Sequence, residues 1–443
     1  MRFRSTFAAT AGLAAMTAML GMAHGATAAP KPRADAPHEA ACPKALPAGT
    51  QCFSGQDMHG AYYWIARPKN WNGTLVVHAH GGPRISKPKP DDPVEDLERF
   101  AVTVQEGYAW AGSNYRRQGY GVRMAAADTD NVRRIATNLL GTPDHVLLHG
   151  QSWGGNVAAK TAELYALDWR GHRNYDGVVL TSGLLGGGTK SYGFRADLRA
   201  VYQYYCHNHP RADEVQYPLW QGLPKGGHMK REDLEARVDE CTGLSKPKDE
   251  RTAEQAKNLA NILAVTHVPE KTLVAHLAWA SNLFQDIVWR RLDGKNPFDN
   301  SKTVYSGSDD DAALNKGIER FSADPQAVRL MAYDSDLTGQ IALPTITLHA
   351  KNDPTAFVGL EAIYRDTVDK AGNGDLLVQN FSDEAVHSKL STPEYAALFS
   401  AMTAWIEKGD KPTKQSVAAL CEEKRKTYDE PCKLLPDFTP KAE

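Results

Sequence analysis

The chain has 443 residues, with 51 lysines and arginines against 53 aspartates and glutamates, for a formal net charge of −2. This near balance argues against nucleic acid as the main partner, because no basic excess exists to displace counterions from phosphates. A mean hydropathy of −0.47, with one long apolar run at the very start, excludes a polytopic membrane protein. The length allows two or three domains, or one large domain with an insertion.

The first 28 residues have the pattern of a secretory signal peptide. Arg2 and Arg4 precede an apolar run over 7–22, and small residues over 25–29 follow it. An uncleaved membrane anchor is the alternative, since the run is long for a signal and short for a span. We predict cleavage after Ala28 and a secreted or periplasmic product without stable membrane insertion.

Six cysteines form three couples that are close in sequence: Cys42 with Cys52, Cys206 with Cys241, and Cys421 with Cys432. In an oxidising compartment each couple can close a disulfide, although the sequence leaves other pairings open. A zinc site is the alternative, but His207 and His209 beside Cys206 complete no recognised ligand set. We therefore expect disulfides and no metal.

Strand-like and helical segments are expected to alternate from about Ala61, after a tail over 30–50 that is rich in Pro, Ala and charge. The predicted strands cover 61–66, 74–79, 108–113, 145–149, 178–180, 345–349 and 376–381. The predicted helices between them cover 94–105, 126–140 and 156–167. This alternation predicts an α/β fold with a mostly parallel sheet and right-handed crossovers.

The pattern changes in the middle of the chain, where long helical stretches over 253–263 and 272–292 replace strands. We interpret this part as a large, mostly helical cap inserted into the sheet domain. The predicted division is a signal peptide over 1–28, an N-terminal extension over 29–60, a first core part over 61–185, the cap over 186–337, a second core part over 338–408 and a C-terminal extension over 409–443.

The strongest chemical signal is the run Gly150-Gln151-Ser152-Trp153-Gly154, followed by Gly155. It is a G-x-S-x-G pattern between a short apolar strand and an Ala-rich helix. Glycines permit the cramped strand-to-helix turn, and the helix N-terminus favours negative charge beside the serine hydroxyl. An ordinary helix cap is the alternative role for this serine. We predict that Ser152 is a nucleophile.

A second segment, His80-Gly81-Gly82-Pro83, ends the strand predicted over 74–79. The backbone N–H of Gly82 can join that of Trp153 to bind a tetrahedral oxyanion, and a glycine leaves room for the substrate carbonyl. A simple Gly-Pro turn is the alternative. His80 itself is interpreted as structural.

A serine nucleophile needs a base, and the base needs an acid that orients it. Asp353 and His387 each follow a predicted strand of the second core part, which places them at the sheet edge of Ser152. His349 and His276 are rival bases, but they are predicted inside a strand and inside a cap helix. A turn role for Asp353 and a surface role for His387 are the alternatives.

The order Ser152, Asp353, His387 resembles that of the α/β-hydrolase superfamily, over roughly residues 60–185 and 338–408. The resemblance implies an α/β-hydrolase fold, with a mostly parallel sheet flanked by helices, and a Ser-His-Asp triad.

Finer resemblances are partial. HGGP together with GQSWGG is similar to the proline iminopeptidase and tripeptidyl aminopeptidase group, which usually has glycine where Arg84 follows HGGP here. The sequence differs from the tannase and feruloyl esterase family, where a disulfide joins the neighbours of Ser and His. Those neighbours are Gln151 and Val386 in this chain.

The cap and nearby loops are expected to set specificity. Tyr115 follows the strand predicted over 108–113, and Trp279 belongs to the aromatic-rich cap, so both are candidate substrate contacts. Aromatic faces can hold an apolar group, but at helical spacing they also pack a cap core. Arg290 and Arg291 are candidate carboxylate ligands, with an exposed helix face as the alternative.

We therefore predict a secreted serine hydrolase that cleaves carboxylic esters through an acyl-enzyme, without a cofactor, on a small-molecule or oligomeric substrate. One alternative is an exopeptidase of the proline iminopeptidase type, which needs cap carboxylates such as Glu214, Glu235 or Glu240 to bind a free amine. Another is a non-catalytic binding protein on the same fold.

Overall fold

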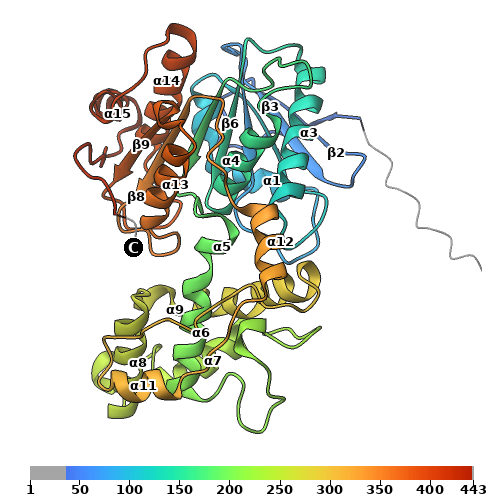
Figure 1. Ribbon diagram of the computed structural model, residues 1–443. Coiled ribbons are helices and arrows are strands. Elements are labelled where there is room, and N and C mark those ends of the chain that lie inside the picture. Colours follow the sequence, from blue (N-terminus) through green and yellow to red (C-terminus); the bar gives the residue numbers. More distant parts are fainter. Residues whose placement is uncertain (1–35, 442–443) are drawn as a thin grey trace, which may run out of the picture.

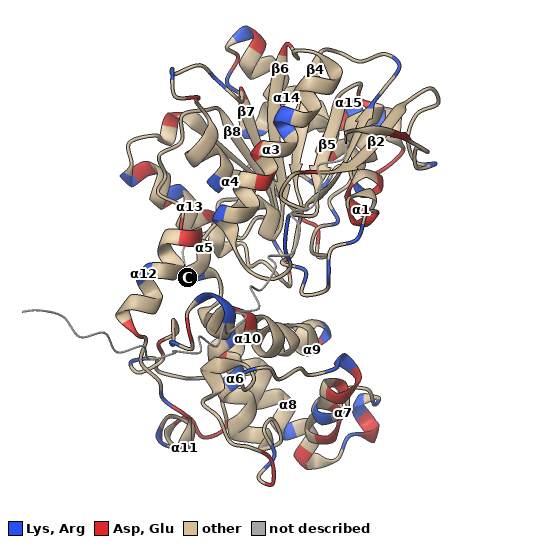
Figure 2. Cartoon of the chain, turned by 90° about the vertical axis from the view of Figure 1, so that its right-hand side faces the viewer, with Lys and Arg blue, Asp and Glu red and all other residues tan. Residues whose placement is uncertain are grey.

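The computed structural model describes residues 36–441, so the predicted signal peptide and the start of the predicted N-terminal extension lie outside the described residues. Figure 1 shows two lobes, one built around a sheet and the other built from helices. In the view of Figure 2, the positions of Lys and Arg are interspersed with those of Asp and Glu along both lobes. Across residues 36–441, none of the helices has the length and apolar character needed to span a bilayer.

One sheet of nine strands lies within the described residues, in the order β1-β2-β3-β5-β4-β6-β7-β8-β9. The strands are β1 His38–Ala40, β2 Gln51–Gln56, β3 Tyr62–Arg67, β4 Thr74–Ala79, β5 Ala109–Ser113, β6 His145–Gln151, β7 Gly177–Thr181, β8 Thr345–Ala350 and β9 Leu377–Ser382. Neighbours from β5 to β9 pair in parallel, whereas β1, β2 and β3 pair antiparallel. This architecture confirms the predicted α/β-hydrolase fold class.

Helices cover both faces of the sheet, which explains why its central strands are continuously apolar. Strands β4, β7 and β8 are buried along their whole length. One face packs against α3 Val122–Leu140, α4 Trp153–Tyr165 and α13 Gly359–Lys370. The other packs against α1 Asp92–Arg99, α2 Ala101–Gln105, α14 Thr392–Lys408 and α15 Lys414–Tyr428.

The register of the parallel strands brings their carboxyl ends together. Ala79 at the end of β4 lies opposite Gly150 in β6. Further along the sheet, Thr181 of β7 lies opposite Leu348, and Ala350 of β8 lies opposite Ser382 of β9. The loops that leave these strands therefore meet at one edge, where ligands bind in sheets of this kind.

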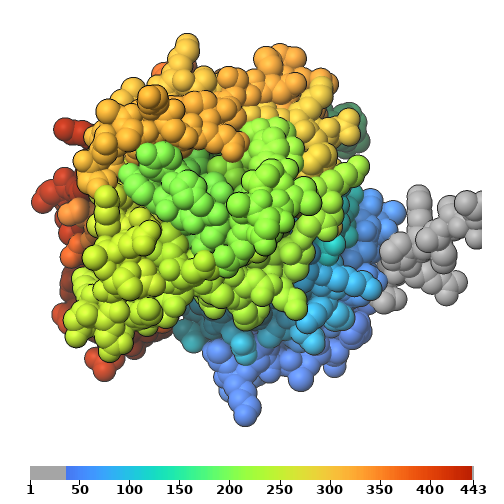
Figure 3. Space-filling view, turned by 90° about the horizontal axis from the view of Figure 1, so that it is seen from below, coloured from blue at the N-terminus to red at the C-terminus, as the bar shows by residue number. Residues whose placement is uncertain are grey.

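The helical lobe is inserted between β7 and β8. Its elements include α6 Gly193–Cys206, α7 Arg231–Thr242, α8 Ala253–Thr266, α9 Leu273–Ala278, α10 Phe284–Asp286 and α11 Asp311–Gly317. The two short helices α5 Gly187–Ser191 and α12 Pro325–Ser335 lie at the junction of the lobes (Figure 1). In Figure 3 this lobe, coloured green to orange, covers most of the face that carries it.

Both predicted cap helices are present. The stretch over 253–263 becomes α8, and the stretch over 272–292 becomes a helical run over 273–291. That run includes two π-helical segments, Trp279–Leu283 and Ile287–Arg291. Such widened turns are often found near functional sites, and Trp279 begins the first of them.

Ordered structure starts before Ala61, contrary to the sequence-based expectation. Strand β1 pairs with β2, and β2 pairs along its length with β3, which extends the sheet by an antiparallel edge. The Pro-rich composition of this segment did not predict strands, because β1 and β2 are held by hydrogen bonds to their neighbouring strands and not by a strong strand propensity of their own.

The three cysteine couples form the predicted disulfides, Cys42–Cys52, Cys206–Cys241 and Cys421–Cys432. The first ties the N-terminal hairpin, the second lies in the cap, and the third anchors the segment after α15. Three disulfides fit a protein of an oxidising compartment.

Candidate active site

Ser152 stands at a sharp turn between β6 and α4. Its φ is +59°, a left-handed conformation that is rare for residues other than glycine. The turn is fixed because the Leu184 N–H donates to the Ser152 carbonyl at 3.0 Å. A Cβ added at Gly154 would collide with the Ala79 carbonyl, and one at Gly155 would lie 2.8 Å from the Gly183 Cα. Glycine is therefore required where the helix start packs against neighbouring strand ends.

Three predicted side chains converge at this edge. The Ser152 Oγ lies 2.9 Å from the Nε2 of His387. The Nδ1 of the same imidazole lies 2.8 and 3.0 Å from the two carboxylate oxygens of Asp353. The Asp353 side chain is fully buried, whereas the His387 side chain is 20% exposed. This arrangement allows a proton to move from the hydroxyl to the imidazole while the carboxylate stabilises the resulting cation.

Asp353 remains ionised despite its burial. Burial would raise the pKa of this carboxyl, but the hydrogen bond from His387 and the nearby imidazoles of His387 and His349 lower the pKa below its ordinary value. The backbone N–H groups of Thr355 and Ala356 also donate to one of its oxygens, at 2.8 and 3.0 Å. The other oxygen faces the imidazole, which fixes the tautomer with the proton on Nδ1.

The two rival histidines make other contacts. The Nε2 of His349 lies 2.7 Å from the Ala356 carbonyl, and its Nδ1 lies 3.3 Å from Glu361. His276 in α9 places its Nε2 2.8 Å from the Pro354 carbonyl, in the loop that carries Asp353. Burial and the charge of a nearby arginine lower the pKa of His276 to about 3, so this imidazole is neutral. Neither histidine contacts Ser152.

The HGGP loop lies against the serine turn as expected. Gly82 and Trp153 border the same cavity as Ser152. Gly82 has a φ of +75°, and a Cβ added there would point into open space. The first N–H groups of a helix have no partner within it, so the amide of Trp153 at the start of α4 is available to a ligand. The geometry suits an oxyanion hole.

His80 stabilises the HGGP loop through two side-chain contacts. Its Nδ1 lies 2.5 Å from Asp96, and its Nε2 accepts from the Nε of Arg84 at 2.8 Å. Arg84 also forms an ion pair with Glu95 of α1 at 2.5 Å. The arginine that departs from the peptidase pattern therefore tethers the loop to α1.

Tyr115 does not lie where the sequence suggested. It is 4% exposed and does not line the cavity at Ser152. Its hydroxyl donates to the His80 carbonyl at 2.9 Å, and its ring packs edge-on against Trp153 at 5.8 Å between centroids. Its φ of +64° turns the side chain inward, which strand-end position alone does not reveal. This tyrosine supports the HGGP loop from within the core.

A small cavity of about 50 Å³ opens at Ser152 between the two lobes. Trp279 of the cap lies at its wall as predicted, together with Tyr192, Leu184 and Leu283. The cavity also contains one charged side chain that sequence reasoning missed, Arg195 of α6. No sequence motif surrounds Arg195, and its separation from Ser152 in the chain gives no sign that the two residues line one cavity.

The cap carboxylates required by a peptidase bind arginines instead. Glu214 pairs with Arg237 at 2.5 Å, and Glu235 pairs with Arg231 at 2.7 Å. Glu240 pairs with Arg211. None of the three glutamates borders the cavity at Ser152.

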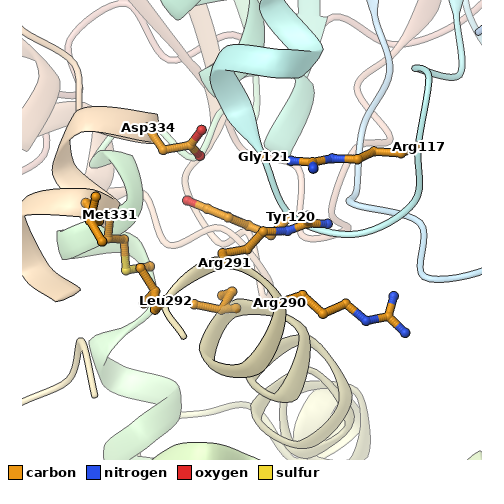
Figure 4. Close-up of a pocket in the computed structure, with 10 residues that line it drawn as sticks. Arg117, Tyr120, Gly121, Arg290, Arg291, Leu292, Met331 and Asp334 are labelled. Atoms are coloured by element: carbon orange, nitrogen blue, oxygen red, sulfur yellow. The ribbon is translucent and has the colours of Figure 1, made fainter. Parts of the chain in front are cut away.

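Arg290 and Arg291 face a different cavity, about 250 Å³ in volume, at the junction of the lobes. Figure 4 shows them with Arg117 and Asp334 around this space. Arg291 donates to the Gln118 carbonyl at 3.0 Å. The residues around this cavity include none of the Ser-His-Asp trio, and neither arginine lines the cavity at Ser152.

No family model matches this chain, and no curated protein matches its sequence. Solved structures with a similar arrangement include an esterase from Aspergillus oryzae, at 14% identity over 82% of this chain and 81% of that one, with a TM-score of 0.42. Feruloyl esterase B from Aspergillus oryzae has 12% identity over 82% and 81%, with a TM-score of 0.43. Candida antarctica lipase A in its closed state has 12% identity over 85% and 86%, with a TM-score of 0.42.

Proposed function

We propose that the protein is a secreted serine hydrolase that cleaves carboxylic esters through an acyl-enzyme. The observation that carries this proposal is the continuous hydrogen-bonded chain from Ser152 through His387 to Asp353, beside a cavity that can hold an acyl group. The esterases and the lipase among the similar solved structures are compatible with it.

The reaction begins when His387 takes the proton of Ser152 as the Oγ attacks the ester carbonyl. The developing oxyanion then accepts hydrogen bonds from the backbone amides of Gly82 and Trp153, both of which line the cavity at Ser152. His387 then passes its proton to the leaving alkoxide as the carbon–oxygen bond breaks. Water attacks the acyl-enzyme by the same route, which releases the acid and restores the Ser152 hydroxyl.

The peptidase alternative lacks support at the cavity. An aminopeptidase must bind a protonated α-amine, but among the described residues that line the cavity the one charged side chain is the cation Arg195, and none is a carboxylate. A positive charge in the cavity repels an ammonium group. The non-catalytic alternative also lacks support, because such proteins have no need for a complete proton-transfer chain.

The test compares the wild-type protein with Ser152→Ala on p-nitrophenyl butyrate and on a fluorophosphonate probe. We expect kcat to fall on the order of 10⁶-fold and labelling to disappear. Ser182→Ala is the matched control, since this buried hydroxyl directly after β7 has no hydrogen-bond partner within residues 36–441 and its loss should leave both readouts unchanged. Hydrolysis or labelling that survives in Ser152→Ala contradicts the proposal.

A parallel assay on aminoacyl-anilides separates the two enzyme classes. Faster release from anilides than from esters would favour the peptidase while leaving the trio intact.

A further inference from the structure

Arg195 is a buried cation without an acidic partner. It is 2% exposed. Arg237 and Arg251 of the cap pair with Glu214 and Glu270, whereas Arg199, one turn later in α6, is also buried without an ion pair among the described residues but lies away from the cavity at Ser152. Within residues 36–441, Arg195 donates to neutral acceptors only. A buried charge without a counter-ion is costly, so its presence beside the nucleophile requires an explanation.

The guanidinium retains capacity for a ligand. Its Nε donates to His276 Nδ1 at 3.1 Å, and its two terminal nitrogens donate to the carbonyls of Ser191 at 3.4 Å and Thr355 at 3.2 Å. Guanidinium carries five N–H groups, so one on each terminal nitrogen stays without a protein acceptor. Two N–H groups on neighbouring nitrogens are the number that a carboxylate accepts in a bidentate contact with arginine.

The surroundings strengthen this preference for an anion. The guanidinium carbon lies 4.5 Å from the ring centroid of Phe194 and 4.8 Å from that of Trp279. Little water reaches the guanidinium, since Arg195 is 2% exposed, and the neutral His276 brings no negative charge that would satisfy the arginine. A charge-assisted hydrogen bond is stronger in such a dry site than at the surface.

The position of the cavity indicates which part of a substrate it holds. His387 must reach the leaving oxygen to protonate it, so the leaving group lies on the imidazole side of Ser152. The cavity that contains Arg195 is bordered by Gly82 and Trp153, but not by His387. It therefore faces the acyl part of the ester.

We propose that Arg195 binds a carboxylate at the far end of the acyl group, which makes monoesters of short dicarboxylic acids the preferred substrates. This inference rests on the proposed ester hydrolysis and specifies its substrate class. The bonds made and broken stay the same: the Ser152 Oγ–acyl bond replaces the ester bond, and water then releases the dicarboxylic acid.

The experiment compares monoethyl glutarate with ethyl pentanoate, which share a leaving group and a five-carbon acyl chain. Ethanol release gives kcat/KM for each. We expect wild-type protein to prefer monoethyl glutarate at least tenfold. Arg195→Met should lower that ratio at least tenfold, mainly through KM. Arg199→Met is the matched control, because Arg199 is equally buried one turn later in α6 but does not border the cavity.

Three outcomes separate the explanations. A wild-type kcat/KM for monoethyl glutarate that does not exceed the value for ethyl pentanoate overturns the inference. An equal decrease in kcat/KM on both esters in Arg195→Met also overturns it, because it would show that the arginine only stabilises the cap. If Arg195→Met fails to fold, inhibition of the wild-type protein decides. Glutarate should then bind at least tenfold more tightly than pentanoate, and equal binding overturns the inference. Failure of the proposed function is distinct, since Ser152-dependent fluorophosphonate labelling would then be absent.

Discussion

Replacing Asp353 with asparagine tests the proposed proton-transfer chain with little change in shape. One carboxylate oxygen accepts the amides of Thr355 and Ala356, and the other lies 2.8 Å from the His387 Nδ1. The asparagine carbonyl can keep the two backbone hydrogen bonds only by turning its NH₂ group toward the imidazole. Nδ1 must then be the unprotonated nitrogen, and Nε2 carries the proton. In this tautomer His387 cannot accept the Ser152 proton.

We expect kcat for Asp353→Asn to fall on the order of 10⁴-fold, the loss seen when the same change reverses the histidine tautomer in serine proteases. At about 1.36 kcal/mol per factor of ten, this corresponds to about 5.5 kcal/mol of transition-state stabilisation. KM should change little, because Asp353 does not border the substrate cavity.

The assay is steady-state hydrolysis of p-nitrophenyl butyrate near pH 7.5, with the thermal midpoint as a check on folding. Glu384→Gln is the matched control. Glu384 lies three positions before His387 but pairs with Lys433 at 2.9 Å, so its loss should leave kcat unchanged. A decrease of less than tenfold in folded Asp353→Asn, or an equal decrease in Glu384→Gln, would refute the assigned orientation of the imidazole.

Three further predictions concern the support of the site. Tyr115→Phe removes the hydrogen bond to the His80 carbonyl. Because a buried hydrogen bond contributes about 1 kcal/mol, we expect kcat to fall about fivefold while KM stays unchanged. A rise in KM alone would instead indicate that Tyr115 contacts the substrate. The double variant Cys206→Ser/Cys241→Ser opens a loop of 35 residues in the cap. We expect urea titrations to show a free energy of unfolding that is lower by about 3 to 4 kcal/mol. A decrease of less than about 1 kcal/mol would contradict this expectation. Burial lowers the pKa of Arg195 to about 10, so the guanidinium is charged at neutral pH and loses its proton as the pH rises through that value. The preference for monoethyl glutarate over ethyl pentanoate should therefore decline between pH 9 and about 11, measured against a Ser152→Ala background, whereas a ratio constant over this range would exclude Arg195 as its source.

The sequence alone was sufficient to predict the features that depend on local backbone conformation. The apolar runs at 74–79 and 345–349 become buried parallel strands, because helices on both faces leave no room for polar side chains. The glycines around Ser152 predicted its turn, since no other residue fits so close to neighbouring strands. Ser152, Asp353 and His387 each follow a parallel strand, which predicted that they would meet, because parallel strands end at a single sheet edge.

Only the tertiary structure decided where the cap and loop side chains point. Tyr115 turned inward and Arg290 and Arg291 reached another cavity, although each occupies a plausible position in sequence. Arg195 lines the cavity at Ser152 because the start of α6 packs near the sheet edge, which no local pattern records. Side-chain direction in an inserted lobe depends on packing between segments that are far apart in the chain. A motif constrains its own backbone, whereas the chemistry of a cavity depends on every segment that surrounds it.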